Sequence, residues 1–418
     1  MRSMDLPMTR WIPSLALMVF MFYGLNMDNI LGMRRFSPLH YQVVLFFLVL
    51  VVVYVWRSAR SGASSLPRMF AHPVIAWVVL YVGIAVLSLA VAYDIDYARN
   101  GIIYAVTTAA VVGAAAIAFS PPVRLSRWQT GHVASLVLVV ACVSLLLDPI
   151  VDLRARFGTG WTSIYDRTRA GGIYFQPNLA SSVVSFLLAT VIPRVRPKFA
   201  LSCAVLSVAA IALTFSRQGL LLVTLVVMMG YARGYLPRGW TLAAALACAL
   251  TFAWFQGATV MEGVFQIDEG SGLARLSRTY DYVSRDAVES DVRVDIASAA
   301  WKKFLRAPFL GRGVGYSWVF QDSQLNMGGT HNMYLRYMLE YGLMGALLWP
   351  LYLWALYRAR SRRLDRAWVV GVLVIAMIAA LFSHVLSESG AFLVALMGAI
   401  LLPVPERRNT EMRPLKHT

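Results

Sequence analysis

Three basic side chains, His331, Arg217 and Arg293, stand where they could take part in chemistry. The unperturbed pKa of a histidine is about 6.5, so His331 can accept a proton at neutral pH. An arginine binds phosphate oxygens through two parallel charge-assisted hydrogen bonds. These residue types suit a site that holds an anionic phosphate group and accepts a proton.

Each of these side chains also has a structural interpretation. Arg217 could be an anchor that reaches lipid headgroups, although an anchor needs no Ser, Gln and Gly around it. Arg293 could be an ordinary helix-surface charge paired with neighbouring carboxylates. His331 could be a structural histidine at the border of a membrane span.

Motifs for several other chemistries are missing from the sequence. No second His, Cys or carboxylate lies at metal-ligand spacing beside His331, so no metal site is predicted. There is no Walker loop, no paired-Asp motif for a metal-bound nucleotide sugar and no serine nucleophile elbow. The glycines at 311, 313 and 315 resemble a phosphate-binding nest only weakly, because no strand and helix frame them. We therefore expect no cofactor.

The composition indicates that a membrane surrounds the elements that position these residues. Hydrophobic residues make up 59% of the 418 residues and charged residues 14%, whereas about a quarter of a soluble domain is charged. Runs able to cross about 30 Å of hydrocarbon predict an all-α polytopic membrane protein with about 12 transmembrane helices. These apolar runs extend over 12–31, 39–56, 72–92, 101–119, 132–150, 178–193, 199–215, 218–236, 240–256, 333–356, 367–386 and 390–404.

The formal net charge of +17 indicates topology rather than nucleic-acid binding. The basic residues lie in short loops between apolar runs, whereas a nucleic-acid partner would require them on one soluble face. With a cytoplasmic N-terminus, the basic surplus falls in the tails and inward loops, as the positive-inside rule requires. We therefore expect both termini in the cytoplasm, with Arg217, Arg293 and His331 on the opposite side.

The sequence predicts a single membrane domain over 1–418 with two long outer loops, at 151–177 and 257–332. Ser290 or Asp291 can cap a helix near 291–306 that stops before Pro308. Such an amphipathic helix would lie along the membrane surface or cover a cavity. Its apolar face would hold Val294, Ala297, Trp301, Phe304 and Leu305.

Five short motifs follow one another along the chain. They are a Ser-Arg-x-Gly turn between two spans, an Arg ahead of a Trp in a long outer loop, Pro-x-x-Gly-x-Gly, His-Asn-x-Tyr-Leu and Glu-x-Gly. They stand here as Ser216 to Gly219, Arg293 to Trp301, Pro308 to Gly313, His331 to Leu335 and Glu340 to Gly342. In this order and topology, the chain resembles the O-antigen ligase family over essentially its whole length.

The resemblance implies a GT-C-like glycosyltransferase of the bacterial inner membrane, with a helical cap and an active site facing the periplasm. Its donor would be a glycan on undecaprenyl diphosphate, and its acceptor a sugar hydroxyl of the lipid A core. Arg217 and Arg293 would bind the diphosphate in place of a metal, and His331 would deprotonate the acceptor hydroxyl. One base without a carboxylate nucleophile favours direct displacement with inversion.

Further contacts to the substrates are expected from polar residues on the same side. These residues are Arg312, Asn332, Tyr334, Gln176, Asn178 and Arg169. Glu340 and Glu388 lie near the outer ends of late spans and could either orient His331 or pair with arginines.

Besides a non-catalytic scaffold in an envelope assembly complex, two alternatives stay open. One is another activity of the same superfamily, an O-antigen polymerase or a protein O-oligosaccharyltransferase; the latter typically carries extra C-terminal sequence, which favours the ligase here. The other is a transporter or flippase, because about 12 spans is also a carrier architecture. Carriers usually show repeated halves with polar groups at the midplane, whereas here the polar groups gather at one surface.

Overall fold

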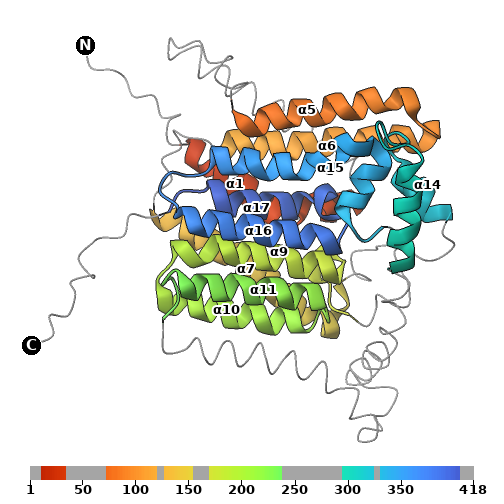
Figure 1. Ribbon diagram of the computed structural model, residues 1–418. Coiled ribbons are helices and arrows are strands. Elements are labelled where there is room, and N and C mark those ends of the chain that lie inside the picture. The colour runs from red at the N-terminus through yellow and green to blue at the C-terminus, as the bar shows by residue number, and fades with distance from the viewer. Residues whose placement is uncertain are drawn as a thin grey trace, which may run out of the picture.

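The computed structural model describes residues 11–33, 72–119, 127–153, 169–237, 294–323 and 330–404. Within these ranges every regular element is a helix. The long helices lie side by side in one bundle, and shorter helices gather at one end of it (Figure 1). The all-α class is thus confirmed for the described residues.

The elements follow one another in a simple order, with the helix over 294–305 called the loop helix below. Their bounds are α1 (Trp11–Gly24), α2 (Met27–Met33), α5 (Pro73–Leu87), η2 (Ser88–Val91), α6 (Ile95–Phe119), α7 (Arg127–Val151), η4 (Gly172–Tyr174), α9 (Pro177–Val191), η5 (Ile192–Arg194), α10 (Pro197–Ala212), α11 (Arg217–Ala232), α14 (Tyr316–Ser323), α15 (Met333–Ala359), α16 (Arg366–Phe382), η8 (Leu386–Glu388) and α17 (Gly390–Leu401).

Helices α17 and α9 form the centre of the bundle. Every residue of α17 is buried, as expected of a helix that is apolar on all sides. Helix α9 carries serines on its buried surface, and the Ser182 and Ser185 hydroxyls donate to carbonyls one turn earlier in the same helix. These bonds satisfy polar groups that have no water to bind at this depth.

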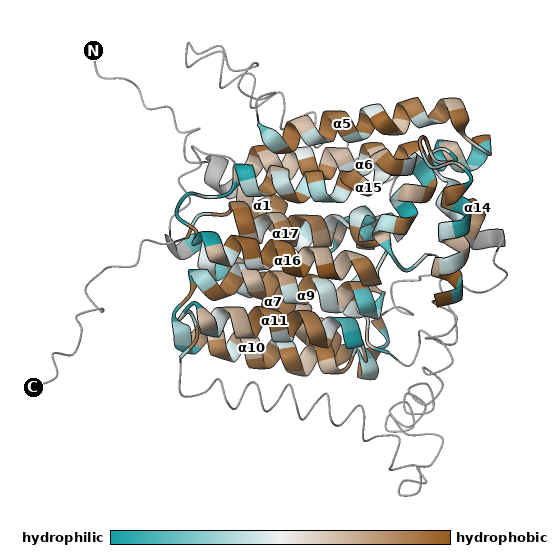
Figure 2. Ribbon diagram, viewed as in Figure 1, coloured by the Kyte–Doolittle hydropathy of each residue, from teal (hydrophilic) through white to brown (hydrophobic). Residues whose placement is uncertain are grey.

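The outer surface of the bundle is apolar along its length and polar at its two ends (Figure 2). Large apolar side chains of α5 and α15 are exposed, among them Leu80, Leu87, Met344 and Leu347. A soluble protein rarely exposes a continuous surface of this kind, whereas a membrane protein presents it to lipid. The described surface is therefore that of an integral membrane protein.

Among the described residues, four helices are long and apolar enough to cross a membrane, namely Pro73–Val91, Ile95–Phe119, Gln129–Val151 and Met333–Ala359. Shorter apolar helices cover Pro197–Ala212, Arg217–Ala232, Arg366–Phe382 and Gly390–Leu401. The predicted runs over 39–56 and 240–256 lie outside the described residues. The count of about 12 spans accordingly stays an expectation.

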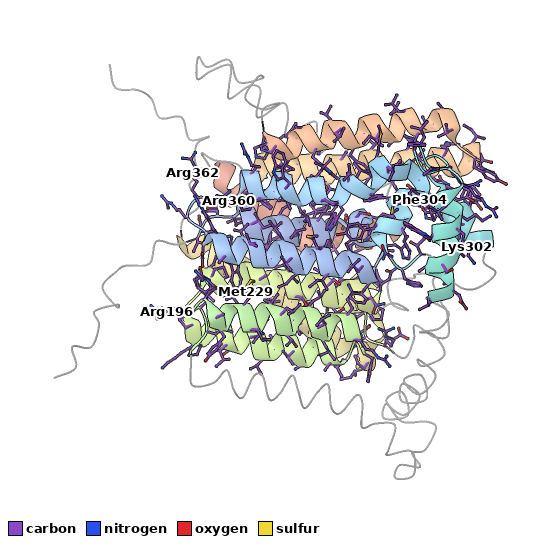
Figure 3. All side chains as sticks on the ribbon, in the orientation of Figure 1. Arg196, Met229, Lys302, Phe304, Arg360 and Arg362 are labelled. Atoms are coloured by element: carbon purple, nitrogen blue, oxygen red, sulfur yellow. The ribbon has the colours of Figure 1, made fainter. Side chains whose placement is uncertain are left out.

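One end of the bundle, the basic end, carries arginines such as Arg196, Arg360 and Arg362, and the loop helix lies at the other end, the loop end (Figure 3). The buried Arg194 belongs to the basic end and donates to the carbonyls of Thr190 at 2.6 Å and Gly398 at 3.0 Å. It thereby binds carbonyls in the last turns of α9 and α17.

The loop helix ends before Pro308, as predicted, and its apolar side chains divide between a buried and an exposed face. Ile296, Ala300 and Phe304 are buried against Tyr316, Phe320 and Leu339 of α14 and α15. Val294, Trp301 and Leu305, which were predicted to share an apolar face with Phe304, are exposed. The reason is that residues spaced by four form the stripe that packs on α14, and the other apolar side chains point away from it.

Candidate active site

The turn ahead of α11 gives each residue of the Ser-Arg-x-Gly motif a distinct position. Ser216 caps α11, since its Oγ accepts a hydrogen bond from the Gly219 N–H at 3.1 Å. Gly219 lets α9 come close, because a Cβ there would lie 2.2 Å from the Cβ of Ser181. Arg217 is the first residue of α11 and is exposed. The motif therefore presents one arginine at a rigidly held helix start.

Arg169 fixes this turn from the preceding loop. Its Nε donates to the Thr214 carbonyl at 2.9 Å, and its Nη2 donates to the Phe215 carbonyl at 3.2 Å. The same Nη2 donates to Oδ1 of Asn178 at 2.9 Å. Arg169 and Asn178, both expected to bind substrate, thus support the backbone beside Arg217, and their contact with substrate stays a prediction.

Gln218 connects Arg217 to the neighbouring helices. Its Nε2 donates to Ser182 Oγ of α9 at 3.2 Å and to the Ala379 carbonyl of α16 at 3.3 Å. Ala379 lies in the last turn of α16, and His384 follows that helix two residues after its end. The outer end of α16 therefore connects the Arg217 turn to the His331 region described next.

His331 lies directly before α15 in a backbone conformation that is unusual for its residue type. Its φ is +48°, a left-handed value that few residues other than glycine adopt. The next residue, Asn332, caps α15 by accepting the Leu335 N–H at 3.1 Å on its Oδ1, and its carbonyl accepts the Thr330 hydroxyl at 3.0 Å. Both bonds hold His331 in this conformation, which is of the strained kind often found at functional sites.

A second histidine, which the sequence reading missed, faces His331. The rings of His331 and His384 meet edge to face, with centroids 5.4 Å apart and planes at 79°. Burial lowers the pKa of His384, and the positive charges of Arg336 and His331 add to this effect, so that the pKa falls to about 3. His384 is therefore neutral at physiological pH.

Arg336 lies at the centre of a buried ionic cluster beside these histidines. Its guanidinium pairs with Glu388, lies 3.5 Å from Glu340 and donates to the His384 carbonyl at 3.3 Å. The Trp318 ring lies 5.4 Å from the guanidinium carbon. Glu340 and Glu388, left open between orienting His331 and pairing with arginines, both pair with Arg336.

The ionic cluster also ties α14 to α15. The Ser317 hydroxyl of α14 donates to the Glu340 carboxylate, and both side chains are buried. On the other side, Tyr337 hydrogen-bonds Ser387 in the segment that carries Glu388. These contacts join α14, the first turns of α15 and the connection between α16 and α17 around His331.

Helix α15 is broken at Gly342, where φ is +64°. The 308–313 segment fills the break: its Arg312 and Gly313 N–H groups donate to the carbonyls of Leu339 at 2.9 Å and Glu340 at 3.0 Å. Below the break, the Leu343 N–H donates to the Pro308 carbonyl at 2.8 Å. The Pro-x-x-Gly-x-Gly and Glu-x-Gly motifs are thus two halves of one junction.

Glycine is required on both sides of this junction. A Cβ on Gly342 would lie 2.4 Å from the Phe309 carbonyl oxygen, and one on Gly311 would lie 2.5 Å from the Glu340 carbonyl oxygen. The glycines at 311, 313 and 315 accordingly allow the backbone of another segment to come close to theirs. This gives them a packing role in place of the phosphate-binding one that the sequence indicated only weakly.

The break divides α15 into two parts with different surroundings. The part after Gly342 spans about 25 Å at a rise of about 1.5 Å per residue, close to the thickness of the hydrocarbon core. The part before it, Met333 to Tyr341, carries the buried charges of Arg336 and Glu340. The outer part therefore belongs to the loop end of the bundle.

The remaining predicted residues are placed as follows. Tyr334 is half-buried in the first turn of α15, and Gln176 is half-buried at the start of α9. The Arg312 guanidinium packs 5.3 Å from the Tyr316 ring. Arg293 lies outside the described residues. In the part of the chain that the structure describes, no three His, Cys, Asp or Glu side chains gather in a group that could hold a metal ion.

The fold is that of an integral membrane protein. The Arg217 turn, the two histidines and the Arg336 cluster lie at its loop end. Residues 202–349 match the family model of the O-antigen ligases. This match indicates a transferase of lipid-linked glycans. The matched range includes Arg217, His331 and Arg336, whereas His384 and Glu388 lie beyond it. A comparison with curated proteins gives no match.

Proposed function

We propose that this protein transfers O-antigen polysaccharide from undecaprenyl diphosphate to a sugar hydroxyl of the lipid A core. The observation that carries the proposal is that Arg217 and His331, both in the matched range, flank the same end of α16. An arginine, which suits an anion, and a histidine, which suits proton transfer, thus stand at one end of a membrane bundle. The proposal places this end in the periplasm and both chain termini in the cytoplasm of a bacterial inner membrane.

Arg217 binds the donor diphosphate in this proposal, together with Arg293. Helix starts carry a partial positive charge, so an arginine at the first residue of α11 gains nothing from the helix itself. An anion placed there is stabilised by both the arginine and the helix N–H groups. Negative charge grows on the diphosphate as it leaves, and fixed positive groups lower the barrier by stabilising that charge without a metal.

His331 is the general base. The acceptor oxygen forms a bond to the anomeric carbon while the bond from that carbon to the phosphate oxygen breaks. The hydroxyl proton passes to His331, and undecaprenyl diphosphate leaves with the electron pair of the broken bond. A single displacement of this kind inverts the anomeric configuration.

The polyprenyl chain of the donor remains in the bilayer while its headgroup reaches the loop end. Lateral entry between helices suits a substrate whose tail is insoluble in water. The loop helix forms a wall of this region, held to α14 and α15 by Ile296, Ala300 and Phe304. Arg312, Tyr334 and Gln176 are proposed to contact the sugars or phosphates.

Reconstituted protein with three alternative acceptors tests this function. Donor glycan on undecaprenyl diphosphate is supplied with EDTA, without nucleotide, and with lipid A core, a second lipid-linked glycan or an acceptor peptide. Product that forms only with lipid A core as the acceptor, with inverted anomeric configuration at the new bond, supports the ligase. Product only with the second glycan identifies a polymerase, and product only with peptide identifies a protein glycosyltransferase. No product, with glycolipid moved across the bilayer instead, identifies a transporter.

A further inference from the structure

The ring of His384 has no part in the proposed reaction, although it lies directly against the proposed base. We propose that His384 is a positioning residue, whose ring, fixed in place through Arg336, sets the orientation of the His331 imidazole. This inference rests on the proposed function for its kinetic consequence only. Its structural consequence can be measured without any transfer activity.

The contact between the rings is of a kind that orients them. Edge-to-face pairs with centroids between about 4.5 and 7 Å are the favoured arrangement of neighbouring rings. The 5.4 Å separation and 79° interplanar angle of His331 and His384 fall in that arrangement. Because the backbone of His331 is held by the cap at Asn332, the ring of His384 restricts the remaining rotation about the side-chain bonds.

The His384 backbone is itself held by a buried charge. Arg336 donates to the His384 carbonyl and pairs with Glu388 four residues later, so both ends of the connection between α16 and α17 are tied to α15. Glu340 lies 3.5 Å from the same guanidinium. Arg336 thus holds this segment through the Glu388 carboxylate and the His384 carbonyl, while Glu340 of α15 binds the same guanidinium. A segment held in this way is more rigid than a solvent-exposed loop.

The surroundings of His384 fit packing rather than proton transfer. Its Nδ1 is buried, and among the described residues it has no hydrogen-bond partner. Arg336 and His331 both face it and disfavour a second positive charge, in line with its lowered pKa. Of the two histidines, His331 is therefore the one that takes the proton.

Two variants at position 384 separate packing from chemistry. His384→Phe keeps an aromatic ring and removes the nitrogens, whereas His384→Ala removes the ring. We expect His384→Ala to lower kcat at least about tenfold, because small misplacements of a base are costly, with little change in the KM for the donor. His384→Phe should restore most of that loss. Equal loss in both variants would assign His384 a chemical role, and an unchanged rate in His384→Ala would remove any role; either result overturns the proposal.

Chemical modification tests the same inference without turnover. Diethyl pyrocarbonate modifies neutral imidazoles, and the rate at His331 can be followed by peptide mass spectrometry. We expect a several-fold faster rate in His384→Ala and a wild-type rate in His384→Phe, with the exposed His132 on α7 as internal control in every sample. Equal His331 rates in all three proteins would contradict the positioning role. If wild-type protein shows no transfer, the proposed function fails while this experiment still decides the inference.

Discussion

The guanidinium of Arg336 pairs with the carboxylate of Glu388 across two elements that are far apart in the chain. Both residues lie at the loop end, and the side chain of Arg336 is almost fully buried. A buried ion pair contributes little when it is compared with an apolar pair of the same volume, but its loss is costly when one partner stays behind unpaired. This asymmetry makes the pair a sensitive point of the site.

Replacing Arg336 with methionine should destabilise the protein strongly. The substitution leaves Glu388 and the buried Glu340 without their cation, a change that costs about 3 to 5 kcal/mol. The measurement is the Tm in detergent by intrinsic fluorescence. The matched control is Arg233→Met, which breaks the more exposed pair with Asp365 at the basic end and should cost at most about 1 kcal/mol. Similar Tm losses for the two variants would refute this assignment.

Gly342→Ala should disturb the junction that holds the outer part of α15. An alanine there must adopt a φ of +64° with its Cβ 2.4 Å from a carbonyl oxygen, so stability should fall by at least about 1 to 3 kcal/mol. Transfer activity should also fall, because His331 lies directly before the outer part of α15 that this junction holds. Gly83→Ala in α5 is the control, because no atom lies within 4 Å of its Cβ position, and it should be neutral or stabilising in the same Tm assay.

Arg217 should be needed for catalysis and not for folding. Because Arg217 is exposed, Arg217→Ala should change the Tm little. We expect kcat/KM for the lipid-linked donor to fall about 100-fold, the cost of losing one charge-stabilising donor. Arg217→Lys should recover only part of it, because lysine cannot form two parallel bonds to phosphate. Arg196→Ala at the basic end serves as control, and a loss there as large as in Arg217→Ala would point to nonspecific charge effects.

Acid should destabilise the protein partly through His384. The folded state lowers the pKa of His384 to about 3 from about 6.5 in the unfolded chain, so the unfolded state binds more protons between these values. The stabilisation that comes from neutral His384 is therefore fully present above about pH 6.5. It is lost as the pH falls toward about 3, by up to about 1.4 kcal/mol per pH unit. Tm values between about pH 7.5 and about pH 5 should fall less steeply in His384→Phe than in the wild type; parallel curves would show that the imidazole does not titrate with unfolding.

The sequence predicted the helical elements and the main motifs because these depend on local patterns. Apolar runs mark α5, α6 and α16, and the Ser216 and Asn332 caps stand in motifs that were recognised. The loop helix ended before Pro308, as a proline requires. The stripe of Ile296, Ala300 and Phe304 that packs on α14 was not predicted, because it depends on where α14 lies.

The contacts between distant segments could not be read from spacing. His331 and His384 meet only because α15 and α16 pack together, and the break at Gly342 depends on a segment about 30 residues earlier in the chain. One signal was present and unused: Arg336 is a charged residue inside an apolar run, which alone marks a functional candidate. Its partners Glu340 and Glu388 were noted, but no local pattern connects all three.

In the proposed reaction, His331 removes the proton from the acceptor hydroxyl during glycan transfer. The most direct measurement compares His331→Ala with wild type in reconstituted membranes containing undecaprenyl-diphosphate-linked glycan, lipid A core and EDTA. His132→Ala, which removes an exposed histidine of α7, is the control. We expect the transfer rate to fall at least about 100-fold for His331→Ala, with donor binding retained and His132→Ala unaffected. Transfer by His331→Ala at the wild-type rate would contradict it.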